Sequence, residues 1–235
     1  MNNSTLYDNI LEYIQNNLGT FHEARIGKIK NLKLKNLLKR KNPYLFRTKF
    51  ETAEEIVRWL CDATISSSEE TLFWNWLEWL AIYINSLVYN WRKSAIEGID
   101  LEFQKEKDIL TIVTIKSGPN WWNASQIGKM KTYFEKAKRT LRTSGWTLNI
   151  LAVNGCCYGK ENIVDKWDYY KFCWQKFWEF ISWEKTLYID IIKPLGDQSR
   201  IKNNEFNTIY SEIINKLTRD FSIEYCDING AILWE

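Results

Sequence analysis

Hydrophobic positions in the first part of the chain recur at helical spacing. Residues 3–19 place a set of apolar side chains on one face and then reach a glycine, which predicts an amphipathic helix that ends at Gly19. The apolar positions are Leu6, Ile10, Leu11 and Ile14. A second helix is predicted over residues 25–40, followed by a turn over residues 41–46.

Two more helices are expected before the pattern changes. The segment 52–65 begins with Thr52 as a cap and carries Glu54 and Glu55 in its first turn, where the helix dipole favours acids. The segment 66–90 begins with serines and glutamates and continues as an apolar run, which predicts a separate helix. The first part of the chain is therefore expected to be helical.

Strand patterns begin at residue 98. Residues 98–104 alternate apolar and polar side chains, residues 105–108 are polar, and residues 109–117 are β-branched almost throughout. Alternation is typical of a half-buried strand, and a β-branched run is typical of a strand buried on both faces. The two segments are therefore expected to form a β-hairpin with a polar turn.

Helices and strands alternate in the remainder of the chain. The predicted elements are a helix over 124–145 capped by Asn123 or Ser125, a strand over 146–155, a helix over 164–183, a strand over 186–196 and a helix over 204–221. This order indicates an α/β fold with a mixed β-sheet flanked by helices and an N-terminal helical region. No strong linker divides the sequence, so residues 1–235 are expected to form a single domain.

The composition is that of a soluble globular protein, with 45% hydrophobic and 26% charged residues. The net charge of +3 neither establishes nor excludes a nucleic-acid partner. Segments 25–48 and 127–142 are basic, and each is either a nucleic-acid surface or a solvated helix face. No signal segment or membrane-spanning apolar run is recognised, so a cytoplasmic protein with no membrane partner is expected.

Residue counts exclude several kinds of chemistry. The five cysteines form no Cys-x-x-Cys pair and the only histidine is His22, so a zinc site lacks its ligand set and buried thiols are expected. A cysteine or serine nucleophile with a histidine base would depend on His22, and no glycine-rich phosphate loop is present. Carboxylates, lysine and a metal ion remain as the means of catalysis.

Two acids and a lysine lie at the ends of the predicted hairpin. Asp100 and Glu102 share a strand face because side chains alternate, and Lys116 at the end of the next strand is expected beside Asp100. Mg²⁺ is suited to one or two carboxylates with phosphate and water, and it makes water a usable nucleophile near neutral pH. The pattern therefore predicts a magnesium site that acts on a phosphoryl group, where Lys116 orients the water and offsets charge.

The alternative for these residues is a strand end with solvated charges. Three features favour the site: Lys116 follows a buried strand directly, residues 117–120 end that strand abruptly, and the helix before the hairpin carries acids. On that helix Glu70, Trp74 and Glu78 lie on one face by the four-residue step.

These segments resemble the PD-(D/E)XK nuclease core, and specifically type II restriction endonucleases. The resemblance rests on "GIDLEF…TIVTIKSGPNWWN" and on the upstream block "KNPYLFR…SSSEET…LE", and it covers residues 41–126. It implies a PD-(D/E)XK-like sheet, with residues 1–92 as a mainly helical part and residues 93–235 as the catalytic core and C-terminal helices. It also implies a Mg²⁺-dependent DNA phosphodiesterase that acts as a homodimer on a short duplex site.

The resemblance assigns roles to individual residues. Asp100 matches the first motif acid and Lys116 the motif lysine, but Thr114 stands where the pattern expects the second acid. Glu102 is the expected substitute, so Asp100 and Glu102 are the predicted metal ligands, and the upstream helix supplies a further glutamate. The predicted catalytic residues are Asp100, Glu102, Lys116, Glu78 and Glu70.

The segment after the predicted catalytic strand is expected to contact DNA. Asn and Gln side chains can read adenine edges, an exposed Trp can stack on a base, and the basic residues of helix 124–143 suit phosphate contacts. The alternative for Trp121 and Trp122 is that they cap the sheet. The predicted DNA-contact residues are Ser117, Asn120, Trp121, Asn123, Ser125, Gln126 and Lys129.

Three functions stay open at this stage. The first is a site-specific double-strand DNA endonuclease, and the second is another nuclease with the same core that serves repair, transposition or RNA cleavage. The third is a non-catalytic DNA-binding module with a decayed site, which the missing acid at Thr114 supports best. The tryptophan-rich segment 167–183 is expected to form core or an interface.

Overall fold

The chain folds into two compact units, each built from separated segments. In the computed structural model, which describes residues 3–39, 42–89, 91–119, 123–143 and 149–234, the first unit comprises Met1–Asn16 and Trp74–Leu195. We call it the sheet unit. The second, the helical unit, comprises Asn17–Phe73 and Gly196–Glu235.

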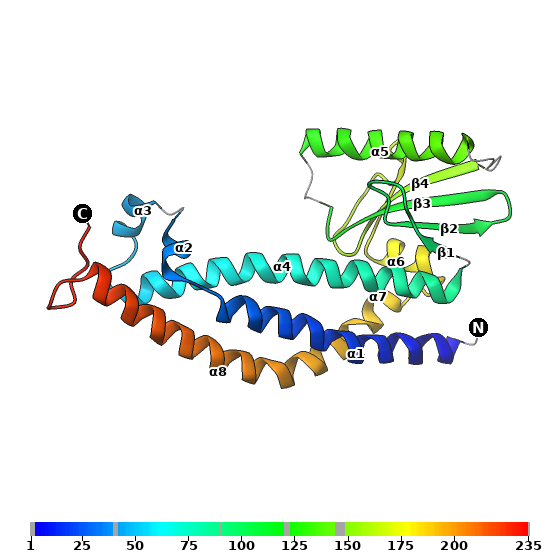
Figure 1. The fold of residues 1–235 in the computed structure, drawn as a ribbon. Helices are drawn as coiled ribbons and strands as arrows, with labels where there is room; N and C mark the ends of the chain where they lie inside the picture. Colours follow the sequence, from blue (N-terminus) through cyan, green and yellow to red (C-terminus); the bar gives the residue numbers. More distant parts are fainter. Residues whose placement is uncertain (1–2, 40–41, 90, 120–122, 144–148, 235) are drawn as a thin grey trace. The chain divides into compact units, whose positions relative to one another are not determined.

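The secondary structure confirms the predicted fold class of an α/β protein with a mixed sheet, flanking helices and a helical N-terminal region (Figure 1). The helices are α1 (Asn3–Lys30), α2 (Leu34–Leu38), α3 (Pro43–Arg47), α4 (Ala53–Val88), α5 (Ala124–Thr143), α6 (Gln175–Ser182), α7 (Leu187–Asp190) and α8 (Ile192–Tyr225). The strands are β1 (Trp91–Lys93), β2 (Leu101–Glu106), β3 (Ile109–Lys116), β4 (Asn149–Cys156) and β5 (Tyr170–Cys173).

The five strands form one sheet in the order β1-β2-β3-β4-β5. The first three strands are antiparallel neighbours, and β4 and β5 continue the sheet in parallel with β3. The predicted hairpin is therefore confirmed, with Leu101 opposite Val113 and Glu102 opposite Ile112. The parallel connection from β3 to β4 passes through α5, as expected for a crossover helix.

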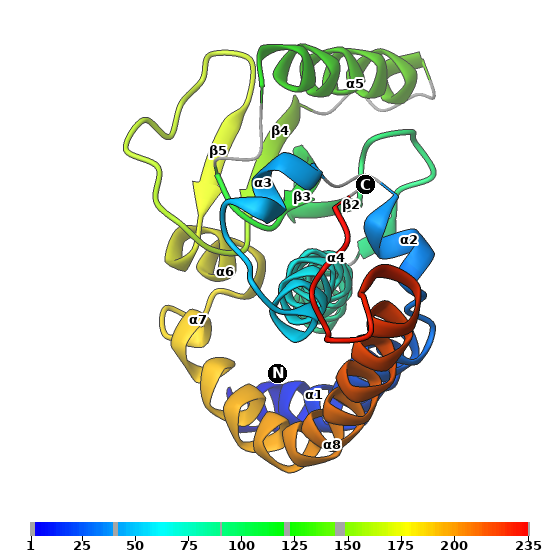
Figure 2. The same ribbon diagram turned by 90° about the vertical axis from the view of Figure 1, so that its left-hand side faces the viewer.

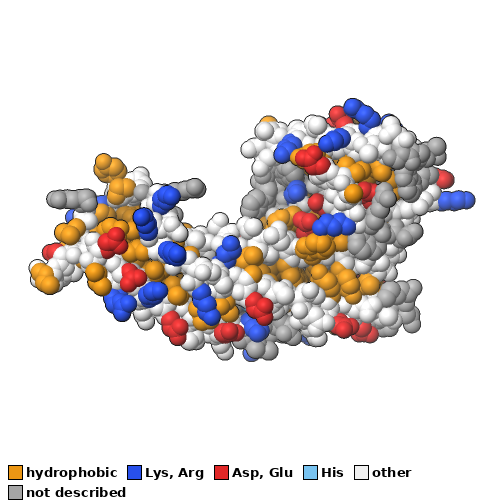
Figure 3. Space-filling view, in the orientation of Figure 1, with side chains coloured by type: hydrophobic (Ala, Val, Ile, Leu, Met, Phe, Trp, Pro, Cys, Tyr) orange, Lys and Arg blue, Asp and Glu red, His pale blue; other side chains and the backbone are white. Residues whose placement is uncertain are grey.

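Helices cover both faces of the sheet within this unit (Figures 1 and 2). Helix α5 covers one face and buries Met130, Phe134, Ala137 and Leu141 against strand residues that include Ile112. The last part of α4 and helix α6 cover the other face, where the ring of Phe103 lies 4.7 Å from that of Tyr89 and 5.7 Å from that of Phe180. The outer surface of α5 carries basic and acidic side chains (Figure 3). The sheet is thus a central layer, as its β-branched third strand predicts.

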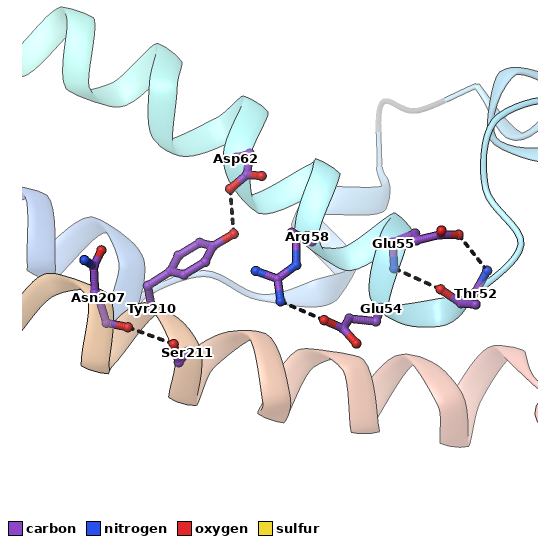
Figure 4. Close-up of polar contacts among 8 residues, drawn as sticks. All are labelled: Thr52, Glu54, Glu55, Arg58, Asp62, Asn207, Tyr210 and Ser211. Carbon is purple, nitrogen blue, oxygen red and sulfur yellow. Dashed lines mark hydrogen bonds and ion pairs between the residues drawn. The ribbon is translucent and has the colours of Figure 1, made fainter.

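The helical unit has its own hydrophobic core and a polar edge. Side chains from α1, α2, α4 and α8 form this core, with Ile29, Val57 and Leu60 fully buried in it. Along its edge Tyr210 donates a hydrogen bond of 2.5 Å to the carboxylate of Asp62, as Figure 4 shows. The unit is therefore stabilised by apolar packing between helices that are far apart in sequence.

Two helices are longer than the sequence pattern predicts. Helix α1 does not end at Gly19, because the buried positions Leu18, His22 and Ile29 continue the same face to the end of the helix. Helix α4 is continuous where two helices were predicted. The hydroxyl of Ser68 donates to the carbonyl of Thr64 at 2.9 Å, so this serine is accommodated inside the helix instead of starting a new one.

The start of α4 confirms the predicted cap. The N–H of Glu55 donates to the hydroxyl oxygen of Thr52 at 3.3 Å, and the Glu55 carboxylate accepts from the N–H of Thr52 at 3.1 Å, as Figure 4 shows. This reciprocal pair satisfies two backbone donors that a helix start otherwise leaves open. Residues 43–47 form the short helix α3, where a turn was predicted.

The last third of the chain contains two wrong predictions. The segment 164–183 is not one helix: residues 170–173 pair with β4 as a strand, and Trp174 has a left-handed φ of 49° before α6 begins. The segment 186–196 is not a strand, since Leu187 and Ile191 are both buried at the four-residue spacing of a helix. The short strand β1 was not predicted at all.

Among the described residues, no helix combines the length and apolar character that a membrane crossing requires.

Candidate active site

The antiparallel pairing of β2 and β3 places Asp100 directly beside the end of β3. The N–H of Asp100 donates to the carbonyl of Val113 at 2.9 Å, which continues the ladder one residue beyond β2. The carboxylate oxygen Oδ2 of Asp100 accepts a 2.7 Å hydrogen bond from the N–H of Ile115. The Thr114 side chain makes a second hydrogen bond to this carboxylate. Asp100 is therefore held in one orientation by the strand that carries Lys116.

Lys116 ends β3 beside the last part of α4. Its ammonium nitrogen lies 5.6 Å from the ring centre of Trp74. Trp74 and Glu78 are one helical turn apart on α4, so they face the same side of that helix. The end of β3 is thus near the face of α4 that carries Trp74 and Glu78, as the sequence analysis grouped them.

Glu78 is the second carboxylate of the site. Burial, followed by the negative charge of Asp100, raises the pKa of Glu78 to about 7, and the charges of Lys116 and Lys93 oppose this increase. Burial also raises the pKa of Asp100, against the Ile115 N–H and the Lys116 charge. Two carboxylates that share a partly buried site repel each other, which is the situation that a bound cation relieves.

An open cavity of about 390 Å³ adjoins these residues. Asp100, Thr114 and Lys116 line it from the sheet, and residues of α5 line it from the helix, all within the sheet unit. The lining residues of α5 are Gln126, Lys129, Met130 and Tyr133. Acidic and basic side chains adjoin one another on the face of the sheet unit that Figure 3 shows. The cavity is therefore bounded by both carboxylate and cationic groups.

Gly98 and Tyr133 line the cavity next to Asp100 and pack closely against each other. Gly98 has a φ of +78°, and a Cβ atom built on it would lie 2.3 Å from Cδ2 of Tyr133. The Tyr133 hydroxyl donates to Glu97 at 3.2 Å, and Lys136 forms an ion pair of 3.2 Å with the same carboxylate. The loop that leads into Asp100 is thus fastened to α5.

The other predicted catalytic acids lie in different surroundings. Glu102 is 2% exposed, and its carboxylate accepts a hydrogen bond from the hydroxyl of Ser94. Glu70 is exposed and belongs to the helical unit. The charges of Asp100 and Lys116 both act on Glu78, and the charge of Lys116 also acts on Asp100.

The predicted DNA-contact residues divide into groups. Gln126 and Lys129 are exposed and line the cavity, and Ser125 is exposed on the first turn of α5. The side chain of Asn123 accepts from the N–H of Gln126 at 2.9 Å, which confirms Asn123 as the helix cap. Ser117 is 8% exposed, whereas Asn120, Trp121 and Trp122 lie outside the described residues.

Three site residues were missed by the sequence analysis. Lys93 lies on the unpredicted strand β1, and Gly98 and Tyr133 meet only through the tertiary fold. The signal available for Gly98 was a glycine two residues before the first motif acid. No sequence signal distinguished Lys93 or Tyr133 from other lysines and tyrosines.

The residues present fit a magnesium ion. Among the described residues, no group of three or more His, Cys, Asp and Glu side chains is arranged to hold a metal. Asp100 and Glu78 supply two carboxylates, and Mg²⁺ uses one or two, with water and substrate phosphate as its remaining ligands. The donor set therefore suits Mg²⁺ better than a metal that requires a complete protein cage.

Comparison with protein-family models identifies a related family. A family model described as type II restriction endonuclease EcoO109I matches residues 8–204, which include every residue of the site. A comparison with curated proteins finds no relative.

Proposed function

Because the chain belongs to the type II restriction endonuclease EcoO109I family, we propose that it is a Mg²⁺-dependent enzyme that cuts double-stranded DNA at a specific short site. We further propose that it has a PD-(D/E)XK catalytic centre, works in the cytoplasm and acts as a homodimer, with residues 1–235 as one functional nuclease domain. The observation that carries the proposal is that Asp100 and Lys116 line an open cavity bounded by the basic helix α5, and that the charges of both act on Glu78.

The reaction is hydrolysis of a phosphodiester. A water oxygen attacks phosphorus and forms a new P–O bond, and the bridging P–O bond opposite to it breaks. The water gives up one proton to solvent or a base, and the leaving oxygen takes the electron pair of the broken bond and a proton. Charge increases on the non-bridging oxygens as the bond forms, so positive groups near them lower the barrier.

Lys116 is suited to hold the attacking water and to stabilise the increasing charge. Its ammonium lies 5.6 Å from the ring centre of Trp74, and its positive charge lowers the pKa of both carboxylates. Asp100 and Glu78 would hold Mg²⁺, which when bound supplies positive charge at the phosphate and makes water easier to deprotonate. The hydrogen bonds from Ile115 and Thr114 fix the Asp100 carboxylate for this role.

We favour Glu78 over Glu102 as the second carboxylate. The negative charge of Asp100 raises the pKa of Glu78 and the positive charge of Lys116 lowers it, so Glu78 is electrostatically coupled to both residues. Glu102 is nearly fully buried and already accepts from Ser94. Isothermal titration of Mg²⁺ into the DNA-free protein tests this choice: Glu78→Gln weakens binding and Glu102→Gln does not. The reverse result would assign the role to Glu102, as the strand alternation predicts.

Contacts to DNA are proposed for the segment that follows β3 and for α5. Lys129 suits a phosphate and Gln126 a base edge, because both are exposed at the cavity. Ser125 and Asn123 lie on the same helix start, which also presents backbone N–H groups to anions. Asn120, Trp121 and Ser117 complete the set proposed from the sequence.

A non-catalytic DNA-binding module is the second candidate, and Thr114 at the position of the motif acid favours it. The nearness of Glu78 to Asp100 favours the enzyme, since it restores a second carboxylate.

Incubation with phage DNA and Mg²⁺ separates the candidates. Discrete fragments support the restriction enzyme, smears indicate a nuclease of another type, and intact DNA with retained binding indicates the module. Asp100→Asn and Lys116→Ala should abolish cleavage and leave DNA binding intact. Normal cleavage by Lys116→Ala would refute the proposed centre.

A further inference from the structure

The segment 117–119, which follows β3 directly, is fastened to the loop between β4 and β5. The backbone N–H of Tyr158 donates a 2.9 Å hydrogen bond to the carbonyl of Ser117. Gly159 has a φ of +89°, and a Cβ atom on it would lie 2.3 Å from Cδ of Pro119, so the two residues pack without space for a larger side chain. The chain after β3 is therefore supported by the chain after β4.

Lys171 attaches the same segment to the edge strand β5. Its ammonium donates a 3.2 Å hydrogen bond to the carbonyl of Pro119. Lys171 pairs with Asn154 on β4, and Asn154 pairs in turn with Thr114 on β3. One strand therefore lies between Lys171 and the strand from which the segment emerges, and the long lysine side chain connects the two.

A carboxylate holds the Lys171 ammonium in place. Glu161 forms an ion pair of 3.1 Å with Lys171 and another of 3.2 Å with Lys166, and it accepts a 3.1 Å hydrogen bond from the N–H of Ile163. The side chains of Lys171 and Glu161 are only 13% and 17% exposed, so water screens this pair weakly. A shielded pair whose hydrogen bonds are made has a defined geometry, and loss of one partner leaves the other charge poorly solvated.

The place of the attached segment gives this contact a role in DNA binding. Residues 117–119 follow Lys116, which lines the cavity, and they begin the DNA-contact segment proposed above. A segment that is ordered before DNA binds does not lose that conformational freedom on binding, so its contacts contribute more to affinity. Lys171 is not among the described residues that line the cavity, so its effect on DNA is indirect.

We propose that Lys171, held by Glu161, is a positioning residue that fixes residues 117–119 in the conformation required for specific DNA binding. This inference rests on the proposed nuclease function and extends it to two residues outside the recognised motif. Because Lys171 acts through the segment and not on the phosphate, it governs the binding of the DNA site and not the rate of the bound complex.

Two variants that change the net charge in opposite directions test this role. Lys171→Met removes a positive charge, and Glu161→Gln removes a negative charge. If Lys171 acted by attracting DNA, the first variant would weaken binding and the second would strengthen it. If the pair holds the segment, both variants weaken binding of the specific site.

Two further variants are the controls. Lys171→Arg keeps the charge and the hydrogen-bond donors. Asp168→Asn makes the same change of charge as Glu161→Gln on the same loop, where Asp168 forms an ion pair of 2.6 Å with Lys131 of α5. This second pair does not involve Pro119.

The probes are two DNA duplexes of equal length. One carries the site at which the unaltered protein cuts phage DNA, and the other lacks it. Single-turnover cleavage with Mg²⁺ at increasing protein concentration gives the rate constant at saturation and the half-saturating concentration. Affinity for the duplex without the site and melting temperature are measured for each protein.

We expect Lys171→Met and Glu161→Gln each to raise the half-saturating concentration by about tenfold, through loss of the ordering of the segment. The rate constant at saturation and the affinity for the duplex without the site should stay close to those of the unaltered protein. Lys171→Arg should recover most of the binding, and Asp168→Asn should not raise the half-saturating concentration.

Three results would overturn the assignment. An unchanged half-saturating concentration in both variants would show that the segment keeps its conformation without the pair, and opposite changes would show that charge alone acts. A parallel loss of melting temperature and of affinity for both duplexes would show a purely structural role. If Lys171→Met does not fold, Glu161→Gln and Asp168→Asn carry the comparison.

Failure of the nuclease proposal is a separate outcome. It is read from the unaltered protein alone, which in that case gives no discrete fragments from phage DNA.

Discussion

Gly98 packs so closely against the ring of Tyr133 that a Cβ atom on residue 98 would have no room. The missing methyl group would lie 2.3 Å from the tyrosine ring, and the φ of +78° is unfavourable for other residues. We expect Gly98→Ala to lower the free energy of unfolding by about 2 kcal/mol, from backbone strain and displacement of the ring. Cleavage should fall as well, since Asp100 follows two residues later. Urea denaturation and a cleavage assay measure the two effects.

Gly128→Ala is the control for this change. Gly128 lies inside α5, and a Cβ atom there would have nothing within 4 Å. Alanine favours a helix interior over glycine by about 1 kcal/mol, so this variant should be slightly more stable than the unaltered protein. Equal stability of Gly98→Ala and the unaltered protein would show that the ring moves away at no cost.

Thr114 is expected to act through the carboxylate of Asp100. Thr114→Val removes the hydroxyl that hydrogen-bonds to Asp100 and keeps the shape of the side chain. The pKa of Asp100 should rise further, and the cleavage rate should fall by about tenfold, which corresponds to roughly 1.4 kcal/mol. Rates measured between pH 6 and pH 9 show both changes.

Thr111→Val is the matched control on the same strand. Thr111 is fully buried, and within the described part of the chain its hydroxyl oxygen has no hydrogen-bond partner. Its replacement by valine removes an unsatisfied buried polar group, so stability should be equal or higher and cleavage unchanged. A loss of cleavage as large as that of Thr114→Val would mean that any change to β3 disturbs the site.

Glu78 makes the stability of the protein depend on pH. Its pKa is about 7 in the folded protein, above the ordinary value of 4.5. Between these values the folded state holds a proton that the unfolded state has released, so the free energy of unfolding falls as pH rises. Glu78→Gln removes this effect. Without divalent metal, the variant should be more stable at pH 8 by about 1 kcal/mol, after allowance for partial exposure, and equal at pH 4.

Thermal denaturation in EDTA at pH 4 and pH 8 measures the difference. A Glu78→Gln variant that loses stability at pH 8 would mean that the carboxylate is stabilised by Lys93 and Lys116 more than it is destabilised by burial.

Lys129 is expected to contact a DNA phosphate. Removing one phosphate contact lowers the slope of the logarithm of affinity against the logarithm of salt concentration by about 0.9. Lys129→Ala should show this decrease and a uniform loss of affinity across DNA sequences. Lys138 is the control on the same helix, because its ammonium donates to the carbonyl of Asp168 at 3.1 Å. Lys138→Ala should keep the slope, and equal slopes for Lys129→Ala and the unaltered protein would remove Lys129 from the interface.

Local pattern was enough to predict the hairpin and the position of Asp100 beside its second strand. The β-branched run of β3 and the alternation around Glu102 fix strand type, and the short turn between them fixes the antiparallel pairing. Asp100 and Lys116 follow from that pairing. Helical spacing from Trp74 singled out Glu78, because that spacing does not depend on what the helix packs against, and its catalytic role stays a prediction.

Tertiary context decided the features that the sequence did not predict. Strand β1 has only three residues, which is too short to show a hydrophobic period, so no sequence pattern indicated that Lys93 lies on a strand. The tryptophan-rich segment has helical spacing throughout, but pairing of Tyr170–Cys173 with β4 overrides it. Gly19 does not end α1, because the buried residues Leu18 and His22 on either side of it continue the packed face of the helix.

The two units are interleaved along the chain, and this affects synthesis on the ribosome. The sheet unit has all of its residues once Leu195 has been made, whereas the helical unit still lacks most of α8 at that point. The apolar side chains of Ile29, Val57 and Leu60 pack with Phe206 and Leu217 in the helical core, so they stay without these partners until residues 206–217 have been made. A nascent chain that pauses near residue 195 would therefore carry an exposed apolar surface, which is a target for chaperones and a risk of aggregation.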